Sequence, residues 1–193
     1  MHVLLSAIEE HPFPQYDFTK RESLTNNLLF IYGLIIASEP LLETAIQKTP
    51  YGELRSYYER HLEEEKGHAT WLLFDLQSID VDPPLVDWGA AQIAGMQYYL
   101  INHVSTQALL GYIAALECRP ASMELVDELE SIHGKQACRT LRYHAEHDLE
   151  HGKALLAFID QLPNANLELI AKNAAWTAWA IRQALLPMSL EAN

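Results

Sequence analysis

Three histidines and three carboxylates fall within residues 144–151 of this chain. An α-helix turns about 100° per residue, so Asp148 would lie about 40° from His144, and His151 about 20° from it on the other side. The same face continues to Leu155 and is otherwise apolar. Burying two histidines beside an aspartate costs several kcal/mol unless something pairs with them. A metal ion is the partner that this set of side chains favours, so the segment predicts a helix with a metal-binding face.

The other polar residues of this segment take different positions around the same helix. Glu146 and Glu150 point to roughly the opposite side, where solvated carboxylates belong. His147 flanks the His144 face at about 60° and is a candidate neighbour of the ligands.

The composition favours an all-α protein with a single domain over residues 1–193. About half of the residues are hydrophobic (49 %), only 8 of 193 are glycine, and long stretches are rich in Ala, Leu, Glu and Gln. Prolines at 12 and 14 predict an extended N-terminal strap over residues 1–20. Residues 187–193 are expected to form a tail.

The periodicity predicts helices that are separated by prolines, glycines and short polar stretches. They are expected over residues 23–38 and 41–47, with an end or a kink at Pro40, and then over 53–77 and 88–103. After a break or bend near Val104, further helices are expected over 106–117, 122–133, 135–162 and 167–186.

The net charge, the apolar runs and the cysteine content together indicate which partners and which location to expect. The formal net charge of −13 argues against nucleic acid and anionic membrane surfaces as partners. The N-terminus does not resemble a signal peptide, and the longest apolar run, residues 28–37, is too short to span a bilayer. Two cysteines are too few for a disulfide framework. We therefore expect a cytoplasmic protein that binds a small molecule, with a homodimer as an open alternative.

Two further segments supply candidate ligands. On the helix predicted over residues 53–77, Glu65 and His68 share a face with His61 and form the i, i+3 pair used in helical di-iron sites. Glu117 follows eleven uncharged residues, and a carboxylate after such a buried run needs a partner. Arg119 or the backbone is the ordinary alternative for that partner.

Together these segments predict one buried metal site. Three carboxylates and three histidines from three helices suit two iron or manganese ions. A polar pocket without metal, in a non-catalytic binding protein, is the alternative. The predicted ligands are Glu65, His68, Glu117, His144, Asp148 and His151.

Three motifs in this order resemble a known family. They are Glu63–His68 with Asp75 downstream, residues 108–112 leading to Glu117, and the His144, Asp148 and His151 set. They resemble the haem-oxygenase-like di-iron oxidases and oxygenases, also called iron-containing redox enzymes, which are relatives of thiaminase II (TenA) and pyrroloquinoline-quinone synthase (PqqC). The resemblance implies a haem-free bundle of about seven helices, with two irons, O2 as co-substrate, and an amino-acid-like or aliphatic substrate.

The chain departs from the family pattern at two positions. His61 stands where some members have a glutamate, and Tyr32 stands near the place of a glutamate on the first long helix. His61 and Glu39, one helical repeat after Tyr32, are candidate replacements. If neither of them is a ligand, we expect the second metal ion to be held weakly. Tyr32, Tyr98 or Tyr112 would serve as a hydrogen donor if it points at the site.

A metal-free enzyme similar to TenA or PqqC, or a binding protein for a small heterocycle, is the competing hypothesis. It would need a nucleophilic cysteine or histidine acid–base chemistry. Neither Cys118 nor Cys138 has an evident activating neighbour in the sequence, which counts against a cysteine nucleophile.

Overall fold

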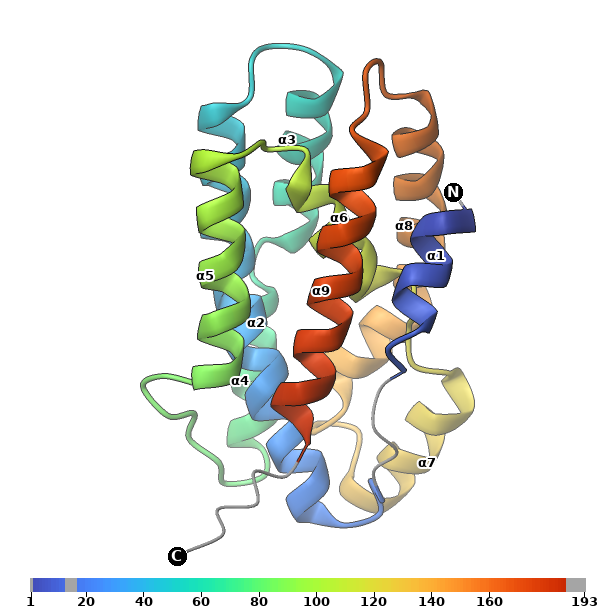
Figure 1. Ribbon diagram of the computed structural model, residues 1–193. Helices are drawn as coiled ribbons and strands as arrows, with labels where there is room; N and C mark the ends of the chain where they lie inside the picture. Colours follow the sequence, from blue (N-terminus) through green and yellow to red (C-terminus); the bar gives the residue numbers. More distant parts are fainter. Residues whose placement is uncertain (1, 13–16, 187–193) are drawn as a thin grey trace, which may run out of the picture.

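All regular secondary structure in the computed structural model, which describes residues 2–12 and 17–186, is helical. The longer helices run roughly along one axis, and α7 lies at one end of the bundle (Figure 1). This confirms the all-α prediction. The helices of the described chain are α1 (His2–Glu9), α2 (Arg21–Lys48), α3 (Glu53–Glu65), α4 (His68–Gln77), α5 (Trp88–His103), α6 (Ala108–Glu117), α7 (Met123–His133), α8 (Arg139–Gln161) and α9 (Leu167–Leu185).

Two long helices organise the packing. α2 packs against α3, α4 and α5, whereas α9 packs against α1, α5 and α6. α8 completes the bundle through contacts with α4, α6 and α7. The larger apolar cluster includes Leu41, Leu110 and Leu155, and a smaller one is built around Leu24 and Leu72. Because helix stability in proteins comes mainly from packing of this kind, these clusters fix the relative positions of α3, α6 and α8.

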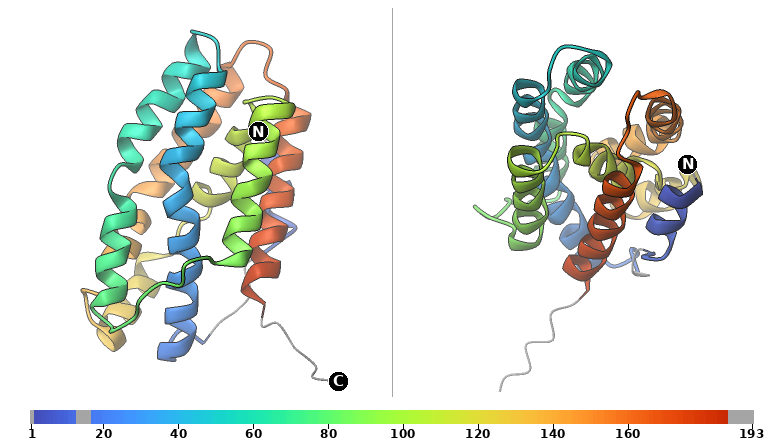
Figure 2. Two further views of the ribbon diagram at one scale, coloured as in Figure 1. Left: turned by 90° about the vertical axis from the view of Figure 1, so that its left-hand side faces the viewer. Right: turned by 45° about the horizontal axis from the view of Figure 1, so that its top comes forward.

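The continuous helix predicted over residues 53–77 is wrong. The segment divides at Gly67, whose φ of 86° lies in the left-handed region that glycine adopts without strain. The Gly67 N–H donates to the Glu39 Oε1 atom at 3.2 Å. α3 and α4 therefore follow one another end to end beside α2 (Figure 2). The turn gives His68 a direction that the spacing along one continuous helix does not predict.

Of the two expectations for Pro40, an end of the helix is wrong, since α2 continues through this residue. Proline removes one helical hydrogen bond, which leaves the carbonyl of Ile36 without its partner in the ladder. Pro40 and Ile36 are both exposed, so the unpaired group lies on the solvent side of the helix. The bend predicted near Val104 is confirmed, because α5 ends at His103 and α6 begins at Ala108.

The N-terminal residues are helical rather than an extended strap. Leu4 and Ile8, one turn apart on α1, are buried, and α1 packs against α9. The prolines that suggested an extended segment lie beyond this helix. Residues 13–16 of the predicted strap and the predicted tail at 187–193 lie outside the described residues.

Two glycines allow helices to approach closely around α6. A Cβ atom at Gly111 would lie 2.2 Å from the carbonyl oxygen of Ile170 on α9. A Cβ atom at Gly152 on α8 would lie 3.1 Å from the carbonyl oxygen of Glu117. These contacts set the position of the C-terminal end of α6, where Glu117 lies, against α8.

One helix, α2, is long and apolar enough to cross a membrane when only length and composition are considered. About a third of its most apolar window (33 %) is buried inside the bundle. Helices in the core of a soluble protein meet the same criterion, so α2 is weak evidence for a membrane span.

Candidate metal centre

The closest group of metal-ligating side chains comes from α3 and α6. One ligand atom from each of His61, Glu65 and Glu117 lies within 4.8 Å of the other two. The His61 Nε2 and Glu117 Oε1 atoms are 3.3 Å apart. Arg119 or the backbone was the alternative partner expected for Glu117. In the structure, Arg119 donates a hydrogen bond from Nη1 to the carbonyl oxygen of His11. The structure thus gives Glu117 a histidine partner from another helix.

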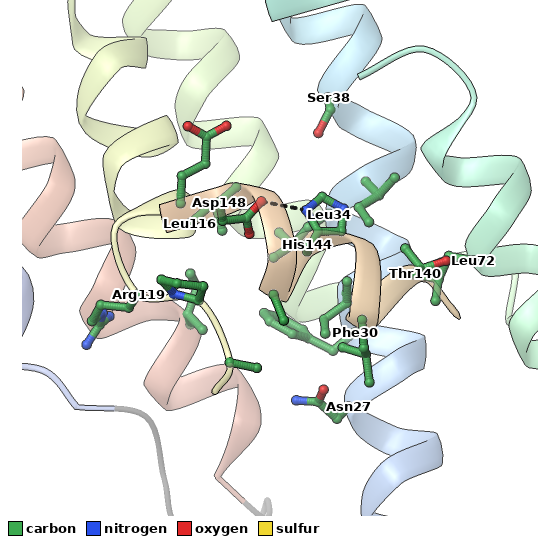
Figure 3. Close-up of a pocket in the computed structure, with 18 of the residues that line it drawn as sticks. Asn27, Phe30, Leu34, Ser38, Leu72, Leu116, Arg119, Thr140, His144 and Asp148 are labelled. Atoms are coloured by element: carbon green, nitrogen blue, oxygen red, sulfur yellow. Dashed lines mark hydrogen bonds and ion pairs between the residues drawn. The ribbon is translucent and has the colours of Figure 1, made fainter. Parts of the chain in front are cut away.

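A second group adjoins the first through Glu65. The His68 Nδ1 atom lies 3.6 Å from the Glu65 Oε1 atom, and the rings of His68 and His144 are 5.1 Å apart between centroids. His144 and Asp148, one turn apart on α8, are joined by a 3.0 Å hydrogen bond between Nδ1 and Oδ1 (Figure 3). Glu65 is therefore the carboxylate between the two groups.

Burial and charge act against one another at this cluster. Burial raises the pKa of Glu117 to about 8; the charge of His61 opposes this rise, while those of Glu65 and Asp148 add to it. Burial acts to raise the pKa of Glu65 as well, but contact with His68 and the charges of His61 and His144 bring that pKa below its usual value. The cluster is therefore a set of mutually interacting groups, typical of functional sites.

The pKa values of the two histidines that face these carboxylates, His61 and His144, are raised, which favours their charged form. Burial acts to lower the pKa of His61, but its hydrogen bond to Glu64 and the charges of Glu117 and Glu65 raise that pKa above its usual value. Burial likewise opposes protonation of His144, and the hydrogen bond and charge of Asp148 outweigh it, so the pKa of His144 is raised.

Several ligand atoms of the cluster have no partner in the described part of the protein. Both ring nitrogens of His68, the Oε2 atom of Glu117 and the Nε2 atom of His144 are buried without a hydrogen bond. Unpaired buried polar atoms are costly and rare in folded proteins. A bound cation would satisfy them, because neutral imidazole and carboxylate are the usual ligands of iron and manganese. The residues therefore fit a metal centre.

The remaining predicted ligands lie at different distances from this cluster. His151 is half-buried and close enough to Glu64 for its charge to help lower the pKa of that carboxyl, after the larger effect of the His61 hydrogen bond. The Oε1 atom of Glu39 accepts the Gly67 N–H, as described above. His147 is exposed, and its Nδ1 atom bonds to the carbonyl oxygen of Tyr143 at 2.7 Å.

The cluster lies in the wall of a cavity of about 390 Å³. Side chains from α2, α3, α4, α6, α7, α8 and α9 line it, and Figure 3 shows Ser38 and Asn27 of α2 toward its opposite ends. Most of the wall is aliphatic or aromatic, which suits a small molecule with an apolar part. The apolar wall includes Phe30, Leu34, Leu72, Leu109, Ile113 and Leu116.

Besides Ser38, three further polar residues of the cavity wall were not candidate site residues in the sequence. Asn27, Arg119 and Thr140 line the cavity but lie in segments without a ligand motif. Thr140 is at the start of α8, where its N–H donates to Asp75 Oδ2 at 2.7 Å. Asp75, which belongs to the sequence motif, is thus a buried side chain that joins α4 to α8. The sequence motif includes Asp75, but its partner depends on tertiary structure.

The fold and the site together define the haem-oxygenase-like class of helical bundles. The family described as iron-containing redox enzymes matches residues 36–184, and the chain belongs to this family. A crystal structure of a TenA homolog from Pseudomonas syringae pv. tomato str. DC3000 has a similar fold, with a TM-score of 0.66 and 13 % sequence identity. The match covers 95 % of this chain and 88 % of that one. No curated protein sequence matches the chain. The predicted family and fold class are confirmed.

Proposed function

We propose that this protein is a non-haem iron oxidase or oxygenase that holds two metal ions and uses O2 as co-substrate. The carrying observation is a buried cluster of carboxylates and histidines with unpaired ligand atoms, set in the wall of an apolar cavity. Membership of a family of iron-containing redox enzymes supports iron, with manganese as the alternative. The proposed substrate is a small amino-acid-like or aliphatic molecule.

The proposed ligands divide into two groups that share Glu65. His61 and Glu117 would hold one ion, and His68, His144 and Asp148 the other, with His151 adjoining the centre from α8. When bound, iron would supply the one-electron chemistry needed to activate O2. Because its pKa is about 8, Glu117 holds a proton at neutral pH in the metal-free protein and gives it up when a cation takes its place.

The residues around the centre provide binding and exclusion of water. The aliphatic side chains of α2, α4 and α6 line the space where an apolar substrate would lie. The buried Tyr112 hydroxyl also lines this space and has no hydrogen-bond partner within residues 2–12 and 17–186. It can therefore donate a hydrogen bond to a bound substrate. Of the three tyrosines considered from the sequence, Tyr112 is the one placed in the cavity wall.

Anaerobic titration with Fe(II), followed by addition of O2, tests the proposal. The expected result is uptake of iron by the cluster and a visible absorption change that depends on both iron and O2. An iron stoichiometry below one, or no O2-dependent change in absorption, would contradict it. An Asp148→Ala variant that keeps its fold and loses iron would support the assignment of the ligands.

The similarity in fold to a TenA homolog supports a second candidate, a metal-free enzyme or binding protein for a small heterocycle. Its most direct chemistry would use a cysteine thiolate. Burial raises the pKa of both Cys118 and Cys138 to about 11, so neither is a ready nucleophile at neutral pH. Metal analysis of the purified protein distinguishes the two candidates.

We further propose a small-molecule substrate, no nucleic-acid or membrane partner, and a cytoplasmic location. The net charge of −13 disfavours nucleic acid and anionic lipid surfaces. A homodimer remains compatible with the exposed aromatic side chains, and sedimentation of the purified protein would decide the oligomeric state.

A further inference from the structure

A continuous set of aromatic rings leads from the candidate metal centre to the protein surface. The ring of His68 lies 4.7 Å from that of Trp71 and 5.1 Å from that of Tyr143, measured between centroids. Trp71 and Tyr143 are 5.2 Å apart, and Tyr143 stacks on His147 at 4.2 Å. Every step is within the range of direct aromatic contact.

Exposure to solvent increases along this set. His68 is buried at 2 % exposure, Trp71 and Tyr143 are half-buried, and His147 is exposed. The inner end is thus a proposed metal ligand, and the outer end is accessible to a molecule in solution. The two middle members of the set, Trp71 and Tyr143, are the side chains that readily lose one electron.

The contacts between α4 and α8 hold the two oxidisable rings together. Arg139 donates from Nη2 to the carbonyl oxygen of Trp71 at 2.8 Å and also pairs with the buried carboxylate of Asp75. Asp75 in turn accepts the N–H of Thr140. These bonds fasten the helix that carries Trp71 to the helix that carries Tyr143, so the ring contacts belong to a fixed interface.

A second aromatic group near the cluster has no exposed ring that is readily oxidised and provides a comparison. Tyr57 stacks on His61 and on Phe158, and it also contacts Tyr58. Tyr57 is 9 % exposed and Tyr58 is fully buried, and the half-buried member of this group is Phe158, which is not readily oxidised. Trp71 and Tyr143 differ from this second group. Both contact a proposed histidine ligand, both are readily oxidised, and both are half-buried.

We propose that Trp71 and Tyr143 form an electron relay that carries single electrons from a soluble reductant to the metal centre. This inference rests on the proposed redox function. Trp71 gives one electron inward and recovers it from Tyr143, whose phenol releases its proton to water. The Tyr143 radical then takes one electron and one proton from an ascorbate-type reductant. The chain is unchanged after each cycle, and one electron has passed inward for each one that the reductant has lost.

The test uses the iron-loaded full-length protein, exposed to O2 without organic substrate and then frozen for electron paramagnetic resonance. The wild type is expected to give a tyrosyl radical signal, and Tyr143→Phe to lose it. Trp71→Phe is expected to weaken it, because the route through Trp71 is lost and only the direct 5.1 Å contact of Tyr143 with His68 is left. Mass spectrometry of peptides is expected to find oxygen added at Trp71 and Tyr143. Re-reduction of the oxidised iron by ascorbate is expected to slow in both variants.

Matched variants separate the relay from simple packing. Trp71→Tyr and Tyr143→Trp keep an oxidisable ring and should restore reduction by ascorbate, whereas the phenylalanine variants keep a ring of similar shape without that chemistry. Trp88→Phe and Tyr99→Phe remove exposed aromatics outside the set and should behave as wild type. Tyr143 is half-buried and is not a proposed ligand, so its variant keeps the test decisive if Trp71→Phe does not fold.

The outcomes distinguish this inference from the proposed function. If the wild type takes up iron and oxidises it with O2, while both phenylalanine variants keep the radical signal and the reduction rate, the relay is wrong and the function stands. A radical confined to Trp88 or Tyr99 would also overturn the relay. If the wild type takes up no iron, the proposed function fails and the relay fails with it.

Discussion

The surroundings of the Glu117 carboxyl group have opposing effects on its pKa. Burial keeps it protonated, and His61 at 3.3 Å favours the charged form. The pKa values of His61 and His144 are also raised, because burial is outweighed by hydrogen bonds to Glu64 and Asp148 and by surrounding carboxylates. All three groups therefore bind protons more tightly in the folded metal-free protein than in the unfolded chain.

This arrangement leads to a pH dependence of stability in the metal-free protein. Stability from Glu117 is fully present below its ordinary pKa of 4.5 and is lost as pH rises through about 8. The two histidines act in the same direction, because their pKa values lie above the ordinary value of 6.5. We expect the melting temperature of metal-free protein to fall as pH rises from 4.5 through about 8.

Glu117→Gln is the control for this effect, since the amide keeps the shape and removes the titration. We expect a flatter dependence of melting temperature on pH in this variant. A wild type that gains stability with rising pH, or a Glu117→Gln variant with an unchanged profile, would contradict this explanation. Added Fe(II) should reverse the trend, because metal binding requires the deprotonated ligands.

His61 is the residue at which this chain departs from the family pattern, and it contacts Glu117 directly. We expect His61→Ala to weaken the binding of one of two ions, by about tenfold or more, because changes around ligands commonly have at least this effect. Iron titration followed by metal analysis measures the change. Glu63→Ala is the matched control, since Glu63 is exposed and pairs with Lys66. Equal iron uptake by both variants would remove His61 from the site.

At the scale of the elements, α6 has little space to move. Its Gly111 lies close to the backbone of α9, and the atoms that an added Cβ would meet are backbone atoms, which cannot rotate away as a side chain could. We expect Gly111→Ala to destabilise the protein by about 1–3 kcal/mol, the usual cost of overpacking. Denaturant unfolding at fixed pH measures this effect.

Gly95 provides the control for that substitution. It is exposed on α5, and a Cβ atom there would meet nothing within 4 Å. Gly95→Ala should stabilise by about 0.5–1 kcal/mol, because alanine is the better helix former. A Gly111→Ala variant as stable as Gly95→Ala would show that α6 and α9 are not held as closely as described.

The helices themselves show what local sequence can and cannot predict. The spacing of His144 and Asp148 on α8 predicts their contact, because it depends only on helical geometry. The turn at Gly67 depends on Glu39, which is 28 positions away in sequence, so the periodicity favoured one continuous helix instead. The effect of Pro40 also depends on its surroundings. Proline removes one hydrogen bond of the helix, but the helix can continue where the carbonyl that loses its partner faces solvent.

At the scale of the whole molecule, the bundle brings α3, α6 and α8 around one buried cluster. The sequence predicted the family, the all-α fold and most of the residues that meet there. It did not predict the 3.3 Å approach of His61 to Glu117, since the distance between α3 and α6 depends on the packing of every helix around them. The cavity beside the cluster likewise forms only when the seven helices that line it, α2, α3, α4, α6, α7, α8 and α9, are in place.

Iron binding by this cluster is the central claim. Anomalous scattering at the iron edge, from crystals grown with Fe(II) under anaerobic conditions, would locate and count the ions in one measurement. The expected result is two peaks within the cluster, one beside His61, Glu65 and Glu117 and one beside His68, His144 and Asp148. No peak there, or iron only at the surface, would contradict the proposed metal centre.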